Sequence, residues 1–431
     1  MDMANLTRQL AGCACGKEHT ASFRTVAVAS GVTGQTGSLL SEALFPKRLL
    51  VVYDKNTLAA SPGLIDSLSE AGFSILHTDF EDLQIADEFG ANRVLEDVKR
   101  HGAEGILSVG TGSLNDICRY AAAKSNLPFA ILATAPSMDG FASSMAPITI
   151  NGFKRTFPAK TPEVILADTA VLAKSPCELK AAGLGDLLGK YTAHADWVIA
   201  SLLTGEYYCE TVAGLTRDAV DRAVALASRG DTESEDYAAG LMEALILSGL
   251  AMQLCGCTRP ASGAEHHLAH FWEMKFQLAG RKQLFHGKKV GIATGMLADV
   301  YNDLADVPDV TEVQRELDEN ELSAVFGSLW PEARKESFPN PLEEIPFGRV
   351  EEKWPEIKAA LAKVPSGKTV RKLLTEAGGE ATCAQAGIGV DLARQGIRYG
   401  RYARFRITMM RVLDRLTFIP DYEKYVAEQG K

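Results

Sequence analysis

The stretch Gly105-Ile-Leu-Ser-Val-Gly-Thr-Gly-Ser-Leu-Asn-Asp116 decides the fold class of this chain. Its first five residues form a short apolar run typical of a buried strand, and the residues from Asn115 to Lys124 have the spacing of a helix. The glycines between them let the backbone approach a ligand closely, and the helix N-terminus offers free N–H groups to an anion. Ser113-x-x-Asp116 also has capping-box spacing, so a well-capped helix without a ligand is an equal interpretation.

Similar apolar runs alternate with helical stretches on both sides of this turn. The strand-like runs are Arg48–Asp54, Phe73–His77 and Pro128–Ala133, and the helical stretches are Ala59–Ala71 and Arg93–His101. Strands that alternate with helices predict a parallel α/β sheet. Two short extended pieces further on, Ile148–Ile150 and Glu163–Leu166, are expected to form a small hairpin.

After Asp168 the apolar residues follow helical spacing. The long helical stretches are Thr169–Ser175, Ala181–Leu203, Cys209–Ser228, Glu233–Leu254, Gly263–Leu278 and Gly387–Leu416. Seven of the 17 prolines lie between Pro308 and Pro365, which predicts short helices and loops there. We therefore predict an α/β NAD-binding domain (residues 1–168) followed by an all-α metal- and substrate-binding domain (residues 169–431), with the ligand cleft between them.

Composition limits the classes of function that remain. The chain has 431 residues, 46% of them apolar and 23% charged, as in soluble globular proteins. A net charge of −10 argues against nucleic acid as a partner, since phosphate backbones attract basic surfaces. The longest apolar run, Leu241–Leu254, is interrupted by Glu243 and Gly249 and predicts a buried helix rather than a membrane span. The first 25 residues lack a signal-peptide pattern, so we expect a cytoplasmic protein without membrane attachment.

The eight cysteines are too few for a disulfide framework in a chain of this length. The segment Cys13-Ala-Cys15-Gly-Lys-Glu-His19 offers three metal-ligand side chains, but no second Cys or His pair lies nearby in the sequence to complete a tetrahedral site. The pair Cys255-Gly-Cys257 also lacks a partner at zinc spacing. Both groups are therefore interpreted as structural or incidental cysteines.

Polar residues follow two further strand-like runs. Asp54 ends one of them and could accept hydrogen bonds from a ribose diol while repelling the extra phosphate of NADP, although strands often end in a polar residue for no such reason. Thr134-Ala-Pro-Ser-Met-Asp-Gly-Phe-Ala-Ser143 places hydroxyls, an acid and a glycine at the carboxyl edge of the sheet, where open α/β sheets bind ligands. Three polar clusters at three strand ends favour a dinucleotide.

A second set of residues has metal-ligand chemistry. In Glu265-His-His-Leu-Ala-His270, the side chains of His266 and His270 are four residues apart and share one helix face. Such a pair begins many zinc-type sites, but satisfied core histidines are an equal interpretation of the pair alone. Asp186 on a glycine-flanked apolar helix and His286 at the start of another helical segment are candidate partners. One carboxylate and two imidazoles would leave an open coordination position, as a catalytic metal requires.

Five motifs in this order resemble the sn-glycerol-1-phosphate dehydrogenases, within the superfamily of iron-type alcohol dehydrogenases, glycerol dehydrogenase and dehydroquinate synthase. The motifs are Gly112-Ser-Leu-Asn-Asp116, Thr134-Ala-Pro-Ser-Met-Asp-Gly140, Gly183-Leu-Gly-Asp-Leu-Leu-Gly-Lys190, Ser262-Gly-Ala-Glu-His-His-Leu-Ala-His270 and His286-Gly-Lys-Lys289. The similarity runs from about Asp54 to the C-terminal helices. Two features depart from it: Ser30–Gly37 matches no family signature, and Thr111 replaces the middle glycine of the glycine turn.

The resemblance implies a dehydroquinate synthase-like fold and roles for individual residues. NAD(H), or alternatively NADP(H), would contact Asp54, Gly112, Ser113, Leu114, Asn115, Asp116, Thr134, Ala135, Pro136, Ser137 and Ser143. One divalent metal, zinc or nickel, would be bound by Asp186, His266 and His286, which with His270 form the catalytic set. Substrate would contact Asp139, Asp186 and His270.

The activity that the resemblance implies is interconversion of dihydroxyacetone phosphate and sn-glycerol 1-phosphate, with His270 relaying a proton. The substrate phosphate needs local positive charge, for which the candidates are Lys154, Lys160, Lys190, Lys288 and Lys289. The alternatives are a dehydrogenase of an unphosphorylated polyol such as glycerol, a lyase or cyclase like dehydroquinate synthase, and a non-catalytic protein that keeps the fold. We expect a small phosphorylated molecule as the partner and a homo-oligomer as the assembly.

Overall fold

The computed structural model describes residues 10 and 12–430 of the chain. A six-stranded sheet in the order β1-β8-β5-β4-β2-β3 forms the N-terminal part, and all of its neighbouring strands are parallel. Its strands are β1 (Thr25–Ala29), β2 (Arg48–Asp54), β3 (Ser74–Phe80), β4 (Gly105–Gly110), β5 (Phe129–Ala133) and β8 (Val164–Asp168). The predicted parallel α/β sheet is confirmed.

Alternate residues of the central strands pack against helices on opposite faces of the sheet. Leu50 and Val52 of β2 belong to the same core as Val94 and Ile117, whereas Leu49 packs in a second core on the other face. The helices of this part are α2 (Thr36–Glu42), α3 (Lys55–Ala59), α4 (Leu64–Glu70), α5 (Glu88–His101) and α6 (Gly112–Ser125). Because both faces are covered, ligands reach the sheet at the carboxyl ends of its strands.

Three local predictions in this part are wrong. No strand is predicted before Arg48, yet β1 pairs with β8 at one edge of the sheet. The predicted hairpin partners are also incorrect, because β6 (Met145–Ile150) pairs with β7 (Phe153–Pro158) through an Asn151-Gly152 turn in which both residues have positive φ, and β8 is instead a buried inner strand. The helix predicted over Ala59–Ala71 is interrupted at Pro62-Gly63, where Gly63 has φ +80°.

The rest of the described chain is helical. Its helices are α7 (Thr169–Lys174), α8 (Cys177–Leu188), α9 (Lys190–Thr204), α10 (Glu210–Ala227), α11 (Glu235–Cys255), α12 (Ala264–Leu278), α13 (His286–Ala305), α14 (Glu319–Phe326), α15 (Trp330–Lys335), α16 (Arg349–Glu352), α17 (Trp354–Leu361), α18 (Gly367–Glu376), α19 (Val390–Tyr399), α20 (Met409–Val412) and α21 (Tyr422–Glu428). The single stretch predicted over Ala181–Leu203 is two helices, α8 and α9, which meet at Gly189. The stretch predicted over Gly387–Leu416 is likewise divided into α19, α20 and short 3-10 turns.

Helix α11 is central to the helical part. It has the length and composition of a membrane-spanning helix, but 78% of its most apolar window is buried inside the protein. Its burial explains the apolar run Leu241–Leu254, because a helix that is apolar all round has to be covered on every side. The prediction of a buried core helix is confirmed.

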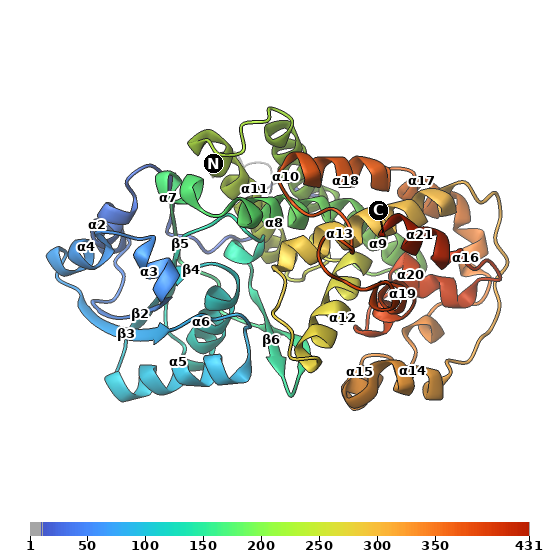
Figure 1. The fold of residues 1–431 in the computed structure, drawn as a ribbon, viewed down its shortest axis with the longest axis horizontal. Helices are drawn as coiled ribbons and strands as arrows, with labels where there is room; N and C mark the ends of the chain where they lie inside the picture. The colour runs from blue at the N-terminus through green and yellow to red at the C-terminus, as the bar shows by residue number, and fades with distance from the viewer. Residues whose placement is uncertain (1–9, 11, 431) are drawn as a thin grey trace.

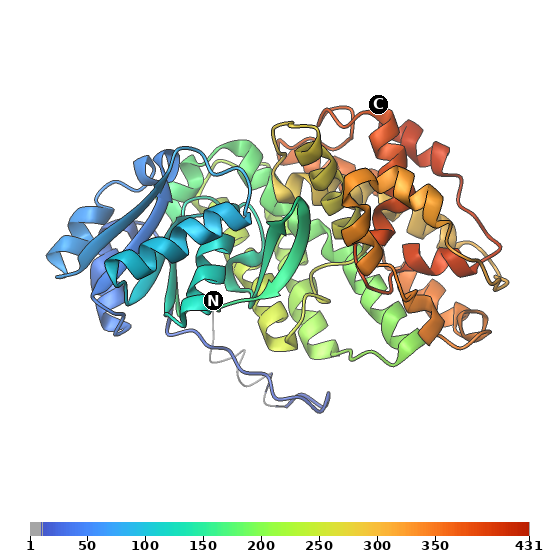
Figure 2. The ribbon, with the colours of Figure 1, turned by 90° about the horizontal axis from the view of Figure 1, so that it is seen from below.

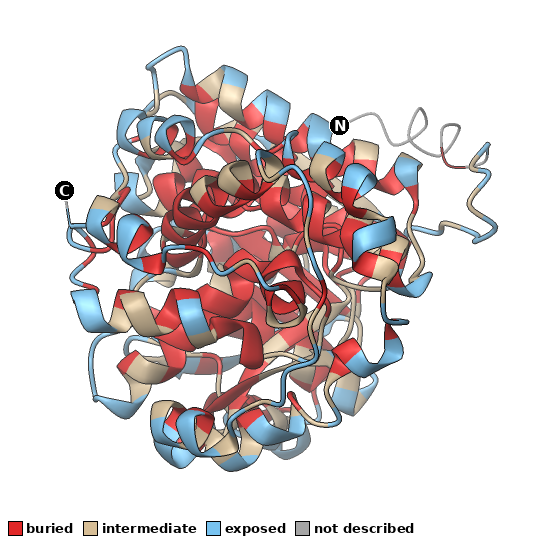
Figure 3. Cartoon of the chain, turned by 90° about the vertical axis from the view of Figure 1, so that its right-hand side faces the viewer, coloured by how far each residue is buried: buried red, intermediate tan, exposed pale blue. Residues whose placement is uncertain are grey.

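The two parts lie side by side along the long axis of the molecule (Figure 1). The sheet and its helices occupy the left of the view, the helices after α8 occupy the right, and the β6–β7 hairpin lies between them. In the view from below, the N-terminal segment before β1 runs along the lower edge of the picture, from the sheet toward the helical part (Figure 2). Buried residues form a continuous interior through the helical part, with exposed residues on its outer faces (Figure 3).

Candidate functional site

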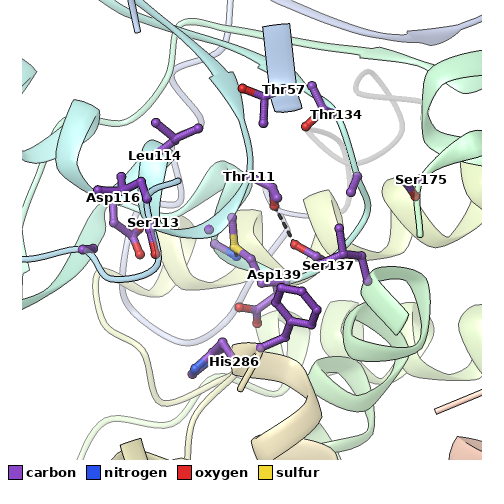
Figure 4. Close-up of a pocket in the computed structure, with 18 of the residues that line it drawn as sticks. Thr57, Thr111, Ser113, Leu114, Asp116, Thr134, Ser137, Asp139, Ser175 and His286 are labelled. Carbon is purple, nitrogen blue, oxygen red and sulfur yellow. Dashed lines mark hydrogen bonds between the residues drawn. The ribbon is translucent and has the colours of Figure 1, made fainter. Parts of the chain in front are cut away.

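A cavity of about 1150 Å³ lies between the two parts. The carboxyl ends of β2, β4 and β5 supply one wall, and the N-terminal residues of α12 and α13 supply the other. Figure 4 shows Asp139 and His286 at one end of this space, with Thr57 and Thr134 further along it. Its volume exceeds the usual range for the pocket of a drug-sized ligand, so the cavity has room for a dinucleotide and a small substrate at the same time.

The three predicted metal ligands meet at the helical end of the cavity. Asp186 lies on α8, His266 on α12 and His286 at the first position of α13, and their ligand atoms all lie within 4.8 Å of one another. Nε2 of His266 is 3.5 Å from Oδ1 of Asp186. Burial lowers the pKa of His286 to about 3, so its imidazole is neutral, which is the form that binds a metal. One carboxylate and two imidazoles fit a divalent ion with an open position.

Glycines allow α8 and α13 to approach closely enough to bring Asp186 and His286 together. A Cβ on Gly287 would lie 1.9 Å from the carbonyl oxygen of Ala182, and a Cβ on Gly185 would lie 2.4 Å from the carbonyl oxygen of Gly287. Neither helix has room for a side chain at these crossings. The glycine spacing in the two motifs is therefore a packing requirement that positions the ligands.

The imidazole of His266 is oriented by a carboxylate on the side of the ring away from the other two ligands. Its Nδ1 lies 2.7 Å from Oε1 of Glu265, which is completely buried. Glu265 in turn accepts hydrogen bonds from the backbone N–H of Gly263 at 2.6 Å and from the hydroxyl of Thr192 at 2.6 Å. A carboxylate at Nδ1 places the proton there and leaves the Nε2 lone pair for a metal, as the second shell of a metal-binding histidine does.

The carboxylate of Asp186 belongs to a buried charge network. Its Oδ2 accepts a hydrogen bond from the backbone N–H of Asp139 at 2.9 Å, and Nζ of Lys190 lies 3.4 Å from its Oδ1. Lys190 also lies 2.8 Å from Oδ2 of Asp139 and donates to the carbonyl of Ala261 at 3.0 Å. Burial alone would raise the pKa of Asp186, but Lys190 and the imidazoles outweigh it and hold the pKa below its usual value. The network keeps Asp186 ionised.

His270 lies beside the metal ligands and is itself outside the group of three. Its ring stacks on His286 with centroids 5.7 Å apart, and its Nδ1 lies 3.3 Å from a guanidinium nitrogen of Arg404. A guanidinium only donates, so Nδ1 accepts and the ring proton lies on Nε2. Burial and the charge of Arg404 hold the pKa of His270 well below its usual value. The ring is therefore neutral, and it can donate a hydrogen bond through its Nε2–H.

The glycine turn opens the N-terminus of α6 toward the cavity. The capping-box interpretation is wrong, because the N-cap is Thr111, whose hydroxyl makes no cap and instead lies 2.6 Å from the hydroxyl of Ser137 (Figure 4). Gly112 has φ +42°, and a Cβ there would meet no protein atom within 4 Å. The first N–H groups of this 14-residue helix thus lack a side-chain cap and border the cavity, which suits the phosphates of a dinucleotide.

Most of the predicted cofactor residues line the cavity. Those that do are Asp54, Gly112, Ser113, Leu114, Asp116, Thr134, Ala135, Ser137 and Ser143, and the predicted substrate residues Asp139 and His270 line it as well. Asp54 also caps α3, since its Oδ1 accepts from two backbone N–H groups at 2.9 Å. Two predicted residues lie elsewhere: Asn115 faces β4, where its Oδ1 accepts from Ser108 at 2.7 Å, and the carbonyl of Pro136 packs against Gly183 of α8.

One wall of the cavity was not predicted. Ser30, Gly31, Thr33 and Gly34 line it directly after β1. The backbone N–H groups of Gly31 and Thr33 donate to the carboxylate of Asp168, at 3.1 and 2.9 Å, which fixes this loop to the end of β8. The detectable signal was a β-rich run followed by glycines and threonines, the same arrangement that marked the turn after β4.

The structure reduces five candidate phosphate-binding lysines to two. Lys160 does not line the cavity. The ammonium group of Lys190 contacts two carboxylates and a carbonyl, and Lys288 pairs with Glu178 and Glu380. Lys154 and Lys289 instead line the cavity, where their Nζ atoms lie 2.6 and 2.8 Å from the carboxylate of Glu273. Two cations on one carboxylate leave a local excess of positive charge near the metal ligands.

Comparison with known proteins assigns this arrangement to a class. A model of the iron-containing alcohol dehydrogenase family matches residues 27–176. The NADH-dependent butanol dehydrogenase A of Thermotoga maritima has the same fold, with a TM-score of 0.63 at 15% identity over 96% of this chain and 98% of that one. The fold is that of the iron-type alcohol dehydrogenases.

Sequence relatives narrow the class further. The glycerol-1-phosphate dehydrogenase (NAD(P)+) of Geobacillus stearothermophilus is 33% identical, and the match covers 97% of this chain and 98% of that protein. The enzyme of the same name from Methanosarcina acetivorans is 30% identical over 64% of this chain and 75% of that protein. The chain belongs to the glycerol-1-phosphate dehydrogenase family.

Proposed function

We propose that this protein is a metal-dependent dehydrogenase that interconverts dihydroxyacetone phosphate and sn-glycerol 1-phosphate with NAD(P)(H). The observation that carries the proposal is the group of Asp186, His266 and His286, whose two histidines line the same cavity as the uncapped N-terminus of α6. Residues 1–168 would hold the dinucleotide, and residues 169–431 would supply the metal and most of the substrate site. The names of the full-length relatives agree with this activity.

The dinucleotide would lie across the carboxyl ends of the strands. Its pyrophosphate would accept hydrogen bonds from the first N–H groups of α6, and Asp54 would accept from the adenosine ribose through Oδ2, the oxygen that does not cap α3. A carboxylate there repels a 2′-phosphate, which favours NAD(H) over NADP(H). The nicotinamide would then lie near Ser137 and Asp139, beside the metal ligands.

The chemistry is transfer of a hydride between nicotinamide C4 and substrate C2, with a proton moving to or from the C2 oxygen. Asp186, His266 and His286 would hold a divalent ion, zinc or nickel, which would supply Lewis-acid polarisation of that oxygen. Nε2–H of His270 would donate a hydrogen bond to the same oxygen, and water in the cavity would exchange the proton. Asp139, fixed by Lys190 and Ser248, would orient a substrate hydroxyl.

The substrate phosphate would bind at Lys154 and Lys289. Both side chains are buried, and both are within reach of the cavity that contains the metal ligands. This pair favours a phosphorylated substrate over an unphosphorylated polyol, because an uncharged substrate has no need of two buried cations. Both a dehydrogenase and a dehydroquinate synthase-like enzyme could use this pair of lysines to bind a phosphorylated substrate. Analysis of the reaction product distinguishes the two activities.

The test is reduction of dihydroxyacetone phosphate by NADH with chiral analysis of the product. The wild-type protein should form sn-glycerol 1-phosphate and should prefer it to glycerol in kcat/KM for the reverse direction. His266→Ala should lose the cavity metal and the activity together, whereas His77→Ala, an exposed histidine outside the cavity, should keep both. Equal use of glycerol, or full activity in His266→Ala, would overturn the proposal.

We also propose where the enzyme acts and how it assembles. The α/β fold, the buried α11 and the net charge of −10 favour a cytoplasmic enzyme with a small-molecule partner and without nucleic acid or membrane as ligands. A homo-oligomer is proposed as the assembly. Sedimentation of the purified protein measures it directly.

A further inference from the structure

The N-terminal segment carries a second group of metal-ligand side chains, well away from the cavity. Cys13, Cys15 and His19 precede β1, and the tertiary structure brings Cys209, the N-cap residue of α10, against them. One Sγ or Nε2 atom from each of the four lies within 4.8 Å of all the others. The sequence interpretation of Cys13 and Cys15 as incidental rested on the lack of a nearby fourth ligand, and the fold supplies one from 190 residues further along.

The separations within this group match the edges of a tetrahedral metal site. Sγ of Cys13 lies 3.5 Å from Sγ of Cys209, and Nε2 of His19 lies 3.2 Å from Sγ of Cys15 and 3.5 Å from Sγ of Cys209. With zinc–sulfur bonds of about 2.3 Å and zinc–nitrogen bonds of about 2.0 Å, tetrahedral geometry places ligand atoms roughly 3.5 to 3.8 Å apart. A disulfide does not account for the arrangement, because a sulfur–sulfur bond is about 2.05 Å long and involves only two of the four.

The histidine is oriented as a ligand. Nδ1 of His19 lies 2.9 Å from the carbonyl oxygen of Leu254, near the C-terminus of α11. A carbonyl only accepts, so the ring proton lies on Nδ1 and the lone pair of Nε2 points to the sulfurs. A backbone carbonyl behind the ring is the usual outer-shell partner of a zinc-bound histidine.

The surroundings of the sulfurs also suit thiolates. The hydroxyl of Tyr207 lies 3.2 Å from Sγ of Cys15, and the hydroxyl of Thr211 lies 3.2 Å from Sγ of Cys13. The backbone N–H of Val212 donates to Sγ of Cys209 at 3.4 Å, at the beginning of the 18-residue helix α10. Hydrogen bonds at the sulfurs are outer-shell contacts of the kind that orient and tune metal ligands.

We propose that Cys13, Cys15, His19 and Cys209 form a structural zinc site. Three cysteines and one histidine fill all four positions of a tetrahedral ion, so the site is closed to substrate. Binding of Zn²⁺ to the reduced group releases the three thiol protons and leaves the histidine neutral. The ion would tie the segment before β1, which runs along the lower edge of Figure 2, to the start of α10 and the end of α11, and so would join the sheet part to the helical part.

Metal analysis separates this site from the one in the cavity. Protein purified without chelators in the His266→Ala background should retain one zinc per chain, and the same protein with Cys15→Ser added should retain none. Cys177→Ser is the matched control, because Cys177 is an exposed thiol outside the group, and it should leave the zinc content unchanged. No zinc in His266→Ala protein, or an unchanged zinc content after Cys15→Ser, would overturn the proposal.

A spectroscopic readout on the unmutated protein avoids any dependence on how the variants fold. Co²⁺ loaded in place of zinc should give thiolate-to-cobalt charge-transfer absorption, to which the cavity site with its oxygen and nitrogen ligands cannot contribute. Addition of Zn²⁺ should abolish that absorption. Cobalt bound without charge transfer, or a Cys13–Cys209 disulfide in freshly purified protein, would contradict the proposed site.

Discussion

Among residues 10 and 12–430, two groups of metal-ligand side chains differ in almost every physical respect. The cavity group has one carboxylate and two imidazoles, borders a space of about 1150 Å³, and lies where three helices meet. The N-terminal group has three thiols and one imidazole and borders no part of that cavity. We call them the cavity centre (Asp186, His266, His286) and the cysteine centre (Cys13, Cys15, His19, Cys209).

Ligand charge explains why these two centres suit different tasks. A divalent ion with one carboxylate and neutral imidazoles keeps a net charge of about +1 and an open position, so it can polarise a bound ketone. The same ion with three thiolates and an imidazole has a net charge of about −1 and no open position. The cavity centre is therefore suited to chemistry and the cysteine centre to holding chain segments together. Four predictions test this contrast.

The largest effect is expected on turnover. His286→Ala should lower kcat/KM for dihydroxyacetone phosphate by on the order of 10³-fold, because Lewis-acid stabilisation amounts to several kcal/mol. Cys15→Ser should change the same quantity by less than about 3-fold in protein that remains folded, since its centre does not touch substrate. Steady-state kinetics on both variants measures the difference, and an equal loss in the two would abolish the distinction.

A smaller effect is expected from the helix crossing that positions the cavity centre. Gly287→Ala places a Cβ against the carbonyl of Ala182 and should destabilise the protein by about 1–3 kcal/mol while lowering metal content at the cavity centre. Gly214→Ala on α10 is the control, because a Cβ there meets nothing closer than 3.6 Å, and it should be neutral or stabilising. Denaturant unfolding with metal analysis tests both. Cobalt charge transfer at the cysteine centre should persist in Gly287→Ala.

The third prediction concerns the group that accepts a hydrogen bond from Nδ1 of the histidine in each centre. Glu265→Gln should lower metal affinity at the cavity centre by about 10- to 100-fold, the usual cost of losing an outer-shell carboxylate. At the cysteine centre the equivalent partner is the carbonyl of Leu254, which side-chain substitution cannot remove. Competition with a chelator of known affinity gives the constants, and Glu178→Gln on the exposed surface serves as the reference. If the metal affinity of Glu265→Gln is unchanged, the carboxylate of Glu265 does not contribute to metal binding.

The smallest effect is expected at the phosphate end of the cavity. Lys289→Gln should lower kcat/KM for dihydroxyacetone phosphate by roughly 10-fold, in line with one charge-assisted hydrogen bond. Activity with unphosphorylated dihydroxyacetone should not fall. Lys288→Gln, whose side chain pairs with Glu178 and Glu380, is the neighbouring control. A parallel loss with both substrates would assign Lys289 to structure and not to phosphate binding.

Local sequence patterns were sufficient for much of the fold, and the resemblance to a family was needed to choose the residues of the cavity centre. Apolar runs of strand length identified β2, β4 and β5, because both faces of a parallel strand are buried. The pattern around Gly105–Asp116 fixed the strand, the turn and the helix in their right order. The Asp186 and His266 motifs were recognisable because their glycines and histidines have fixed local spacing on single helices.

Local patterns did not predict which strands pair when the partners lie far apart in the sequence. The run at Val164–Asp168 could be predicted as a strand, but not as a neighbour of β1 and β5, because its partners lie far away in the sequence. The Asn151-Gly152 pair is a local hairpin signal, and in the structure both residues have the positive φ of such a turn. Lys190 looked like a phosphate ligand from its place one turn after Asp186, and only the fold shows its donors on Asp139, Asp186 and Ala261.

The sequence by itself determined the α/β class and the order of the two parts, since both depend on residue types repeated at local spacing. The resemblance to a family pointed to Asp186, His266 and His286 as candidate metal ligands, and the structure brings the three together. Only the tertiary structure decided which lysines remain for a phosphate, and that Cys209 completes a group with Cys13, Cys15 and His19. Cys209 and His19 are 190 positions apart, and no local periodicity connects them. Their proximity arises from the packing of the N-terminal segment against α10 and α11, which is a property of the folded chain as a whole.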